Sequence, residues 1–145
     1  MKKFIVTGMM LCCMTALFAQ AVPAGWTTDY YAALKQAKAE KKNVLILFTG
    51  SDWCSWCKLL KKNTLDKSSF KRYAKENLVT VYFDFPYDRK ISQRQMGIQQ
   101  SLAKTFGVEG FPTTVVVAPD GRKLLQFSGY RDADNYIKEL ESIKK

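Results

Sequence analysis

Hydrophobic residues follow two different patterns along the chain, a helical spacing and an unbroken apolar run. Tyr30, Leu34 and Ala37 follow a helical spacing with charged residues on the other side, which predicts a surface helix over 29–42. The run 44–48 contains no polar residue, a pattern typical of a strand that other elements cover on both faces. The chain therefore combines an amphipathic helix with a central strand.

The later elements are predicted from the same kinds of hydrophobic pattern and from residues typical of helix caps and turns. Thr27 or Thr28 is expected to cap the first helix, which Asp29 opens, and Asp132 is expected to cap the last helix. A turn at 119–121 joins two strands. In chain order, the remaining predicted elements are a helix over 54–63, a helix over 68–75, a strand over 78–85, a helix over 92–105, and strands over 113–118 and 123–127.

This order predicts an α/β domain with a central mixed sheet of four or five strands and helices on both faces. The strands over 44–48 and 78–85 are expected to be parallel neighbours, because crossover connections in one sheet are right-handed and join adjacent strands. The last two strands are expected to be antiparallel, because only a tight turn joins them. One compact domain suits a chain of 145 residues.

The first 21 residues have the pattern of an export signal. Two lysines precede an apolar run, 4–18, and the small residues of 19–21 suit a cleavage site. The run is shorter than the roughly 20 residues that a spanning helix needs, which favours a cleaved signal over an uncleaved anchor. We therefore predict a signal peptide over 1–21, a domain over 22–145, and a periplasmic or secreted protein.

The charge balance is basic but dispersed. The formal charge is +10, and it falls to +8 without the two lysines of the predicted signal. The other basic residues are spread along the chain, as on a solvated surface, so the composition does not indicate a nucleic-acid site. Weak attraction to acidic partners or lipid headgroups stays open. We expect no nucleic-acid partner, at most peripheral membrane contact, and a monomer.

Cysteine usage points to one redox centre. Of the four cysteines, Cys12 and Cys13 lie within the predicted signal, without the small residues that normally precede a lipidated cysteine. Cys54 and Cys57 remain, after a break in the chain at 49–52 that is expected to place Cys54 at a helix N-terminus. This position favours a thiolate, so Cys54 can attack a foreign disulfide and Cys57 can then displace the product.

A C-x-x-C pair also occurs in zinc sites, haem attachment sites and structural staples. Structural zinc needs four ligands, but the predicted mature chain has two cysteines and no histidine. Covalent haem needs a histidine after the second cysteine, where this chain has Lys58. A staple stays open, although closing so short a loop restricts the unfolded chain by only about 2 kcal/mol. We therefore expect neither a metal nor another cofactor.

Two residues near this pair each have two interpretations. Pro112 starts a strand in the segment Gly110-Phe111-Pro112-Thr113. It is either cis, presenting the backbone of Phe111 to a substrate, or an ordinary trans proline. Trp56, between the cysteines, either shields the disulfide and contacts apolar substrates or packs on its own helix.

Three segments together resemble the thioredoxin superfamily, in particular exported bacterial thioredoxin-like proteins with a Trp-Cys-x-Trp-Cys active site. They are 53–58, with the sequence WCSWCK, 106–113, with the sequence FGVEGFPT, and Gly129. The resemblance extends from Trp26 to the C-terminus. It implies a thioredoxin-like α/β fold and thiol-disulfide exchange.

The resemblance also implies roles for single residues. Cys54 would be the exposed nucleophile and Cys57 the resolving thiol, with Pro112 cis and adjacent to both. Trp56 is added to the substrate-binding residues on its first interpretation, contact with apolar substrates. The expected substrate-binding residues are then Trp53, Trp56, Phe111, Pro112 and Gly129.

One position departs from the family. Thioredoxins resemble one another in a buried aspartate six residues before the first cysteine, proposed to take the proton from the resolving thiol, and this chain has Phe48 there. The proton from Cys57 must then pass to water or to a carboxylate such as Asp52 or Glu109. Phe48→Asp is accordingly expected to speed the resolving step near neutral pH.

Together these features predict an exported thiol-disulfide oxidoreductase, more specifically a reductase or electron relay. Its expected partners are disulfide-containing or dithiol proteins and an unidentified redox partner. A disulfide oxidase or isomerase is an alternative, because about 30 mV of reduction potential corresponds to only ~1.4 kcal/mol. A peptide-binding module with a permanently closed disulfide and a basic structural envelope protein are two further alternatives.

Overall fold

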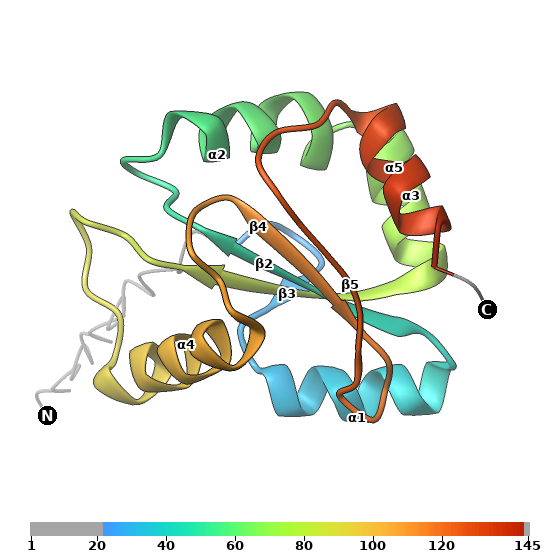
Figure 1. Ribbon diagram of the computed structural model, residues 1–145, viewed down its shortest axis with the longest axis horizontal. Helices are drawn as coiled ribbons and strands as arrows, with labels where there is room; N and C mark the ends of the chain where they lie inside the picture. Colours follow the sequence, from blue (N-terminus) through green and yellow to red (C-terminus); the bar gives the residue numbers. More distant parts are fainter. Residues whose placement is uncertain (1–21, 144–145) are drawn as a thin grey trace, which may run out of the picture.

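A five-stranded mixed sheet forms the centre of the computed structural model, which describes residues 22–143 (Figure 1). The strands are β1 (Trp26–Thr27), β2 (Asn43–Thr49), β3 (Leu78–Asp84), β4 (Thr113–Val117) and β5 (Lys123–Ser128), in the order β1-β3-β2-β4-β5. β3 is parallel to both β1 and β2, whereas β4 is antiparallel to both β2 and β5. Both strand-pairing predictions are confirmed.

Helices cover both faces of this sheet, as predicted (Figure 1). One face is covered by α1 (Tyr30–Glu40) and α4 (Gln93–Phe106), and the other by α2 (Ser55–Leu60), α3 (Ser68–Asn77) and α5 (Ala133–Glu141). A π-helical segment, η1 (Lys61–Leu65), follows α2 directly. Between residues 22 and 143, no helix is long and apolar enough to span a bilayer.

The apolar run of β2 feeds two separate hydrophobic clusters. Val44, Ile46 and Phe48 pack in the cluster under α1 and α4, whereas Leu45 and Leu47 pack in the cluster under α2, α3 and α5. All five side chains are at most 1% exposed. Successive side chains of a strand point to opposite faces, so a central strand covered on both sides needs apolar residues at every position.

The first helix begins one residue later than expected. Asp29 has an extended backbone and caps α1 itself, because its carboxylate accepts a hydrogen bond from the amide of Ala32 at 2.9 Å. The hydroxyl of Thr27 accepts from the Asp29 amide at 3.1 Å, so it supports the cap without being the cap. The prediction that Thr27 or Thr28 caps this helix was therefore wrong.

Two short elements were missed by the sequence patterns. β1 is only two residues long, and its identity as a strand depends on pairing with Thr80 and Val81 of β3. The helix predicted over 54–63 ends as an α-helix at Leu60 and continues as η1 to Leu65. The buried hydroxyl of Thr64 in η1 donates to the carbonyl oxygen of Arg131, a partner 67 residues away that no local period reveals.

Candidate active site

Cys54 lies where the chain leaves the sheet and enters α2. β2 ends at Thr49, and residues 50–53, called the hinge below, lead to Cys54. Cys54 is the N-cap of α2, with an extended backbone, and its sulfur accepts a hydrogen bond from the amide of Cys57 at 3.2 Å. The predicted position of Cys54 at a helix start is confirmed.

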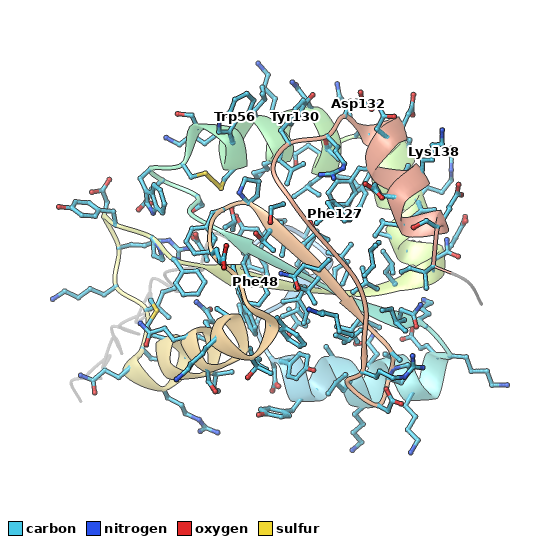
Figure 2. All side chains as sticks on the ribbon, in the orientation of Figure 1. Phe48, Trp56, Phe127, Tyr130, Asp132 and Lys138 are labelled. Carbon is cyan, nitrogen blue, oxygen red and sulfur yellow. A yellow bond between two sulfur atoms is a disulfide. The ribbon has the colours of Figure 1, made fainter. Side chains whose placement is uncertain are left out.

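A disulfide joins Cys54 to Cys57, with their Cα atoms 5.2 Å apart (Figure 2). The sulfur of Cys57 accepts from the amide of Gly50 at 3.5 Å. Cys54 is 7% exposed and Cys57 is 3% exposed, so Cys54 is the more accessible cysteine by a small margin. In the disulfide form Cys54 is therefore far more covered than the expected exposed nucleophile.

The peptide bond between Phe111 and Pro112 is cis, so the trans alternative was wrong. The carbonyl oxygen of Phe111 lies 3.7 Å from the sulfur of Cys54, which confirms that this bond is adjacent to the disulfide. Gly129 follows β5 with φ +84°, a conformation that favours glycine, and its amide donates to the carbonyl of Pro112 at 2.8 Å. Three segments that are distant in the sequence thus meet at the cysteines.

Trp53 stands at the edge of this meeting point with a half-exposed ring. Its side chain is 52% exposed, and its ring lies edge-on to that of Phe111, with centroids 6.0 Å apart. The indole N–H of Trp53 donates to the carbonyl oxygen of Phe85 at 2.8 Å. The ring of Phe85 in turn stacks on that of Phe111 at 4.9 Å. Trp53 is therefore held in place although it faces solvent.

Trp56 lies in the first turn of α2 and is 60% exposed. Its ring stacks on that of Tyr130, with centroids 6.3 Å apart and an interplanar angle of 29° (Figure 2). Tyr130 belongs to the loop between β5 and α5. The stacking partner of Trp56 therefore lies in this loop, and not on its own helix as the second interpretation expected.

The two carboxylates that the sequence offered as proton acceptors lie in different surroundings. Asp52 accepts hydrogen bonds from the amide of Asp88 at 2.8 Å and from the amide of Tyr87 at 2.9 Å. These amides, that of Asp88 first, hold the pKa of the Asp52 carboxyl below its ordinary value. Glu109 is exposed in the loop between α4 and β4.

An ion pair between a buried aspartate and a partly exposed arginine, next to the hinge, was not predicted from the sequence. Asp84, the last residue of β3, has a side chain that is only 3% exposed, and Arg89 forms an ion pair with it. The amide and hydroxyl of Ser51 donate to the same carboxylate at 2.8 and 2.5 Å. The sign of this pair in the sequence was an acidic residue at the end of the predicted strand that became β3.

No group of three or more His, Cys, Asp and Glu side chains suited to a metal ion is found among residues 22–143. The reactive groups described at the site are the two sulfurs, with the amides that bond to them and aromatic side chains nearby.

Comparisons with known proteins agree with this geometry. The sequence model of the family described as "Thioredoxin-like domain" matches residues 30–144. The chain is 32% identical over 119 residues to "Disulfide bond reductase DsbH" of Chlamydia pneumoniae, a match that covers 81% of this chain and 71% of that protein.

Solved structures show the same relationship. The structure titled "DsbH Oxidoreductase" superposes with a TM-score of 0.76 at 30% identity, covering 87% of this chain and 91% of that one. The reduced form of the DsbD C-terminal domain of Neisseria meningitidis superposes with a TM-score of 0.60 at 27% identity, covering 78% of this chain and 92% of that one. The chain therefore belongs to the thioredoxin-like family and is a thiol-disulfide oxidoreductase.

Proposed function

We propose that this protein is an exported disulfide reductase or electron relay, in which Cys54 and Cys57 reduce disulfides of other proteins. The observation that carries the proposal is the disulfide at the start of α2, with the carbonyl oxygen of Phe111 3.7 Å from the sulfur of Cys54. The reductive direction is supported by the 32% identity to a protein named as a disulfide bond reductase.

In the proposed reaction, the reduced enzyme begins with Cys54 as a thiolate. The amide of Cys57, which is bonded to the Cys54 sulfur, favours the negative charge of that sulfur. Cys54 attacks one sulfur of the substrate disulfide, whose S–S bond breaks, and the departing substrate thiolate takes a proton from water.

Cys57 then completes the exchange. Cys57 first gives its proton to water, and its thiolate then attacks the sulfur of Cys54 in the mixed disulfide. The bond between Cys54 and the substrate breaks, the enzyme disulfide forms, and the second substrate thiolate leaves and takes a proton from water. Two electrons have passed from the enzyme to the substrate. An external dithiol must return two electrons to Cys54 and Cys57 before the next turnover.

The residues proposed to bind the substrate surround Cys54. Phe111 and Pro112 supply backbone next to its sulfur, and Gly129 supports that backbone through its hydrogen bond to Pro112. Trp53, which precedes Cys54, and Trp56, two residues after it, both expose large rings. Exposed aromatic side chains around a reactive centre are typical of recognition surfaces for polypeptides.

Export is the second half of the proposal. The segment 1–21, predicted as a cleaved signal peptide, lies outside the described residues. Its support is the sequence pattern of two lysines, an apolar run and small residues. The first described element, β1, begins at Trp26, after the predicted cleavage site.

Trapping of mixed disulfides tests the proposal. A Cys57→Ser variant of the chain, reduced and mixed with an envelope extract of its own cells, is expected to retain partner proteins through Cys54. A Cys54→Ser variant is the matched control and is expected to retain none. If the two variants retain the same partners without a covalent bond, the site is a peptide-binding module. If the wild-type protein oxidises dithiols faster than it reduces disulfides, the reductive direction is wrong.

A further inference from the structure

Three of the four hinge residues, and the residue before the hinge, are hydrogen-bonded to the end of β3 or the loop after it. The amide of Phe85 donates to the carbonyl of Thr49 at 2.8 Å, just before the hinge. Ser51 bonds to Asp84 through both its amide and its hydroxyl. Asp52 and Trp53 make the contacts with the 85–88 segment described above. The segment that leads into Cys54 is thus fixed by a partner segment more than 30 residues away.

Asp84 is the anchor of this connection. Its backbone carbonyl accepts from the side chain of Gln99, which is 1% exposed, at 2.7 Å. Its carboxylate is buried and is compensated by Arg89, whose side chain is 31% exposed. A buried carboxylate without a partner is costly, so Asp84 depends on Arg89 for its charge to be tolerated.

The ion pair and the inner cysteine are bonded to consecutive backbone amides. The amide of Gly50 donates to the sulfur of Cys57 at 3.5 Å, and the amide of Ser51 donates to the carboxylate of Asp84 at 2.8 Å. Because the two amides are neighbours in one short segment, a displacement of Asp84 also displaces the donor to Cys57. The charges of the pair cancel each other, so removing either member leaves a net charge that acts on the sulfurs through a protein interior that screens charge poorly.

We propose that Asp84 and Arg89 are positioning residues for disulfide exchange, which hold the Gly50 amide against Cys57 and balance the charge behind it. This inference rests on the proposed function for its role in turnover, but its electrostatic part concerns only the disulfide itself. The reduced pair carries negative charge when a sulfur ionises, so positive charge behind the hinge favours the reduced form and negative charge disfavours it.

Two substitutions are expected to shift the thiol-disulfide equilibrium in opposite directions. Asp84→Asn leaves Arg89 uncompensated and is expected to shift the equilibrium with glutathione at neutral pH toward the reduced form, by about threefold to tenfold. Arg89→Gln leaves Asp84 uncompensated and is expected to shift it toward the disulfide by a similar factor. A tenfold change in this constant is about 30 mV of reduction potential.

Matched variants separate charge from shape. Arg89→Lys keeps the charge and is expected to stay within about twofold of the wild type, since the cation still faces Asp84. Asp120→Asn and Arg122→Gln break an exposed pair, 68% and 69% exposed, on the turn between β4 and β5, and are expected to have no effect.

Shifts of Asp84→Asn and Arg89→Gln in the same direction would overturn the charge balance on which the proposal rests, because a loosened hinge alone would produce them. If Asp84→Asn does not fold, the comparison of Arg89→Gln with Arg89→Lys decides, and equal constants for these two would also overturn it. Failure of the proposed function is a different result. If the proposed function fails, the wild-type protein reduces no protein disulfide. The equilibrium with glutathione can still be measured in that case, because it needs no protein substrate.

Discussion

The indole ring of Trp53 occupies the space that a side chain on Gly50 would need. A Cβ atom on Gly50 would lie 2.5 Å from Cε2 and 2.7 Å from Nε1 of that ring. Such contacts are too short for any real carbon atom, so one of the two residues must move. Gly50 therefore permits Trp53 to fold back over the hinge and to bond to Phe85.

Gly50→Ala is expected to displace Trp53 and lower activity. The variant loses the hydrogen bond from Trp53 to Phe85 and the edge contact with Phe111, and it strains the segment that holds the Gly50 amide against Cys57. We expect a several-fold loss of kcat/KM for a protein disulfide, a changed tryptophan fluorescence, and about 1–3 kcal/mol less stability to urea.

Gly97→Ala is the matched control for this substitution. Gly97 lies within α4, and a Cβ atom there would meet no atom within 4 Å. Alanine in a helix interior is better than glycine, so this variant is expected to gain about 0.5–1 kcal/mol and to keep full activity. Equal activities for the two variants would show that the place of Trp53 does not matter for turnover.

The sequence predicts those parts of the fold that depend on local patterns. The unbroken apolar run of β2 follows from burial on both faces. The helices α4 and α5 begin where the sequence predicts, because the side chains of Ser92 and Asp132 bond to the first turn of each. β1 was missed because two residues have no period. η1 was missed because α- and π-helices share the same residue preferences over so short a segment.

The candidate site was predictable in its cysteines and in the segment around Pro112, where the motifs are local. Its supporting contacts were not predictable. Ser51 and Asp84 are 33 residues apart, and Asp52 and Asp88 are 36 residues apart, so neither spacing carries a pattern. Only the register of β2 against β3, which places Thr49 opposite Asp84, brings these side chains together.

Phe48→Asp is expected to destabilise the fold at neutral pH. Phe48 is fully buried, and its ring meets that of Phe83 edge-on at 5.5 Å on the face covered by α1 and α4 (Figure 2). Replacing the ring with a carboxylate removes this aromatic packing. The described residues of the cluster are apolar, so they offer the carboxylate no opposite charge. We expect a loss of about 3–5 kcal/mol, whereas Phe48→Leu is expected to lose about 1–2 kcal/mol.

The pH dependence of this variant has a definite sign. Burial raises the pKa of the introduced carboxyl above its unfolded value. The stability of the variant relative to Phe48→Leu is therefore highest below about pH 4 and falls as the pH rises. Urea midpoints measured from pH 4 to pH 8 check this. A constant difference from Phe48→Leu across that range contradicts it. The faster resolving step expected from the sequence is then measured on the folded fraction only.

Asp52→Asn is expected to remove part of the acid sensitivity of the protein. The amides of Asp88 and Tyr87 lower the pKa of Asp52 in the folded state. The stability that Asp52 contributes is therefore fully present above its unfolded pKa, about 3.9, and is lost as the pH falls through the lower folded value. Urea midpoints between pH 2.5 and pH 6 are expected to fall less steeply for Asp52→Asn than for the wild type. Asp120→Asn, on the distant turn after β4, serves as the control and is expected to follow the wild type.

Tyr136 and Thr114 are expected to be energetically coupled in the core. Their hydroxyl oxygens are 2.6 Å apart, and both residues are buried, at 0% and 2% exposure. Burial raises the pKa of Tyr136, so the phenol stays neutral and can donate or accept this hydrogen bond. Tyr136→Phe and Thr114→Val each leave one buried hydroxyl without its partner and are expected to cost about 1–3 kcal/mol. The double variant removes both hydroxyls and is expected to cost less than the sum, by about 0.5–3 kcal/mol in a double-mutant cycle of urea unfolding. Strictly additive losses would contradict this coupling, because they would mean that each hydroxyl finds another partner. Thr114→Ser is the control: it keeps the hydroxyl and removes only the methyl group, so it separates the loss of the hydrogen bond from the loss of the methyl group.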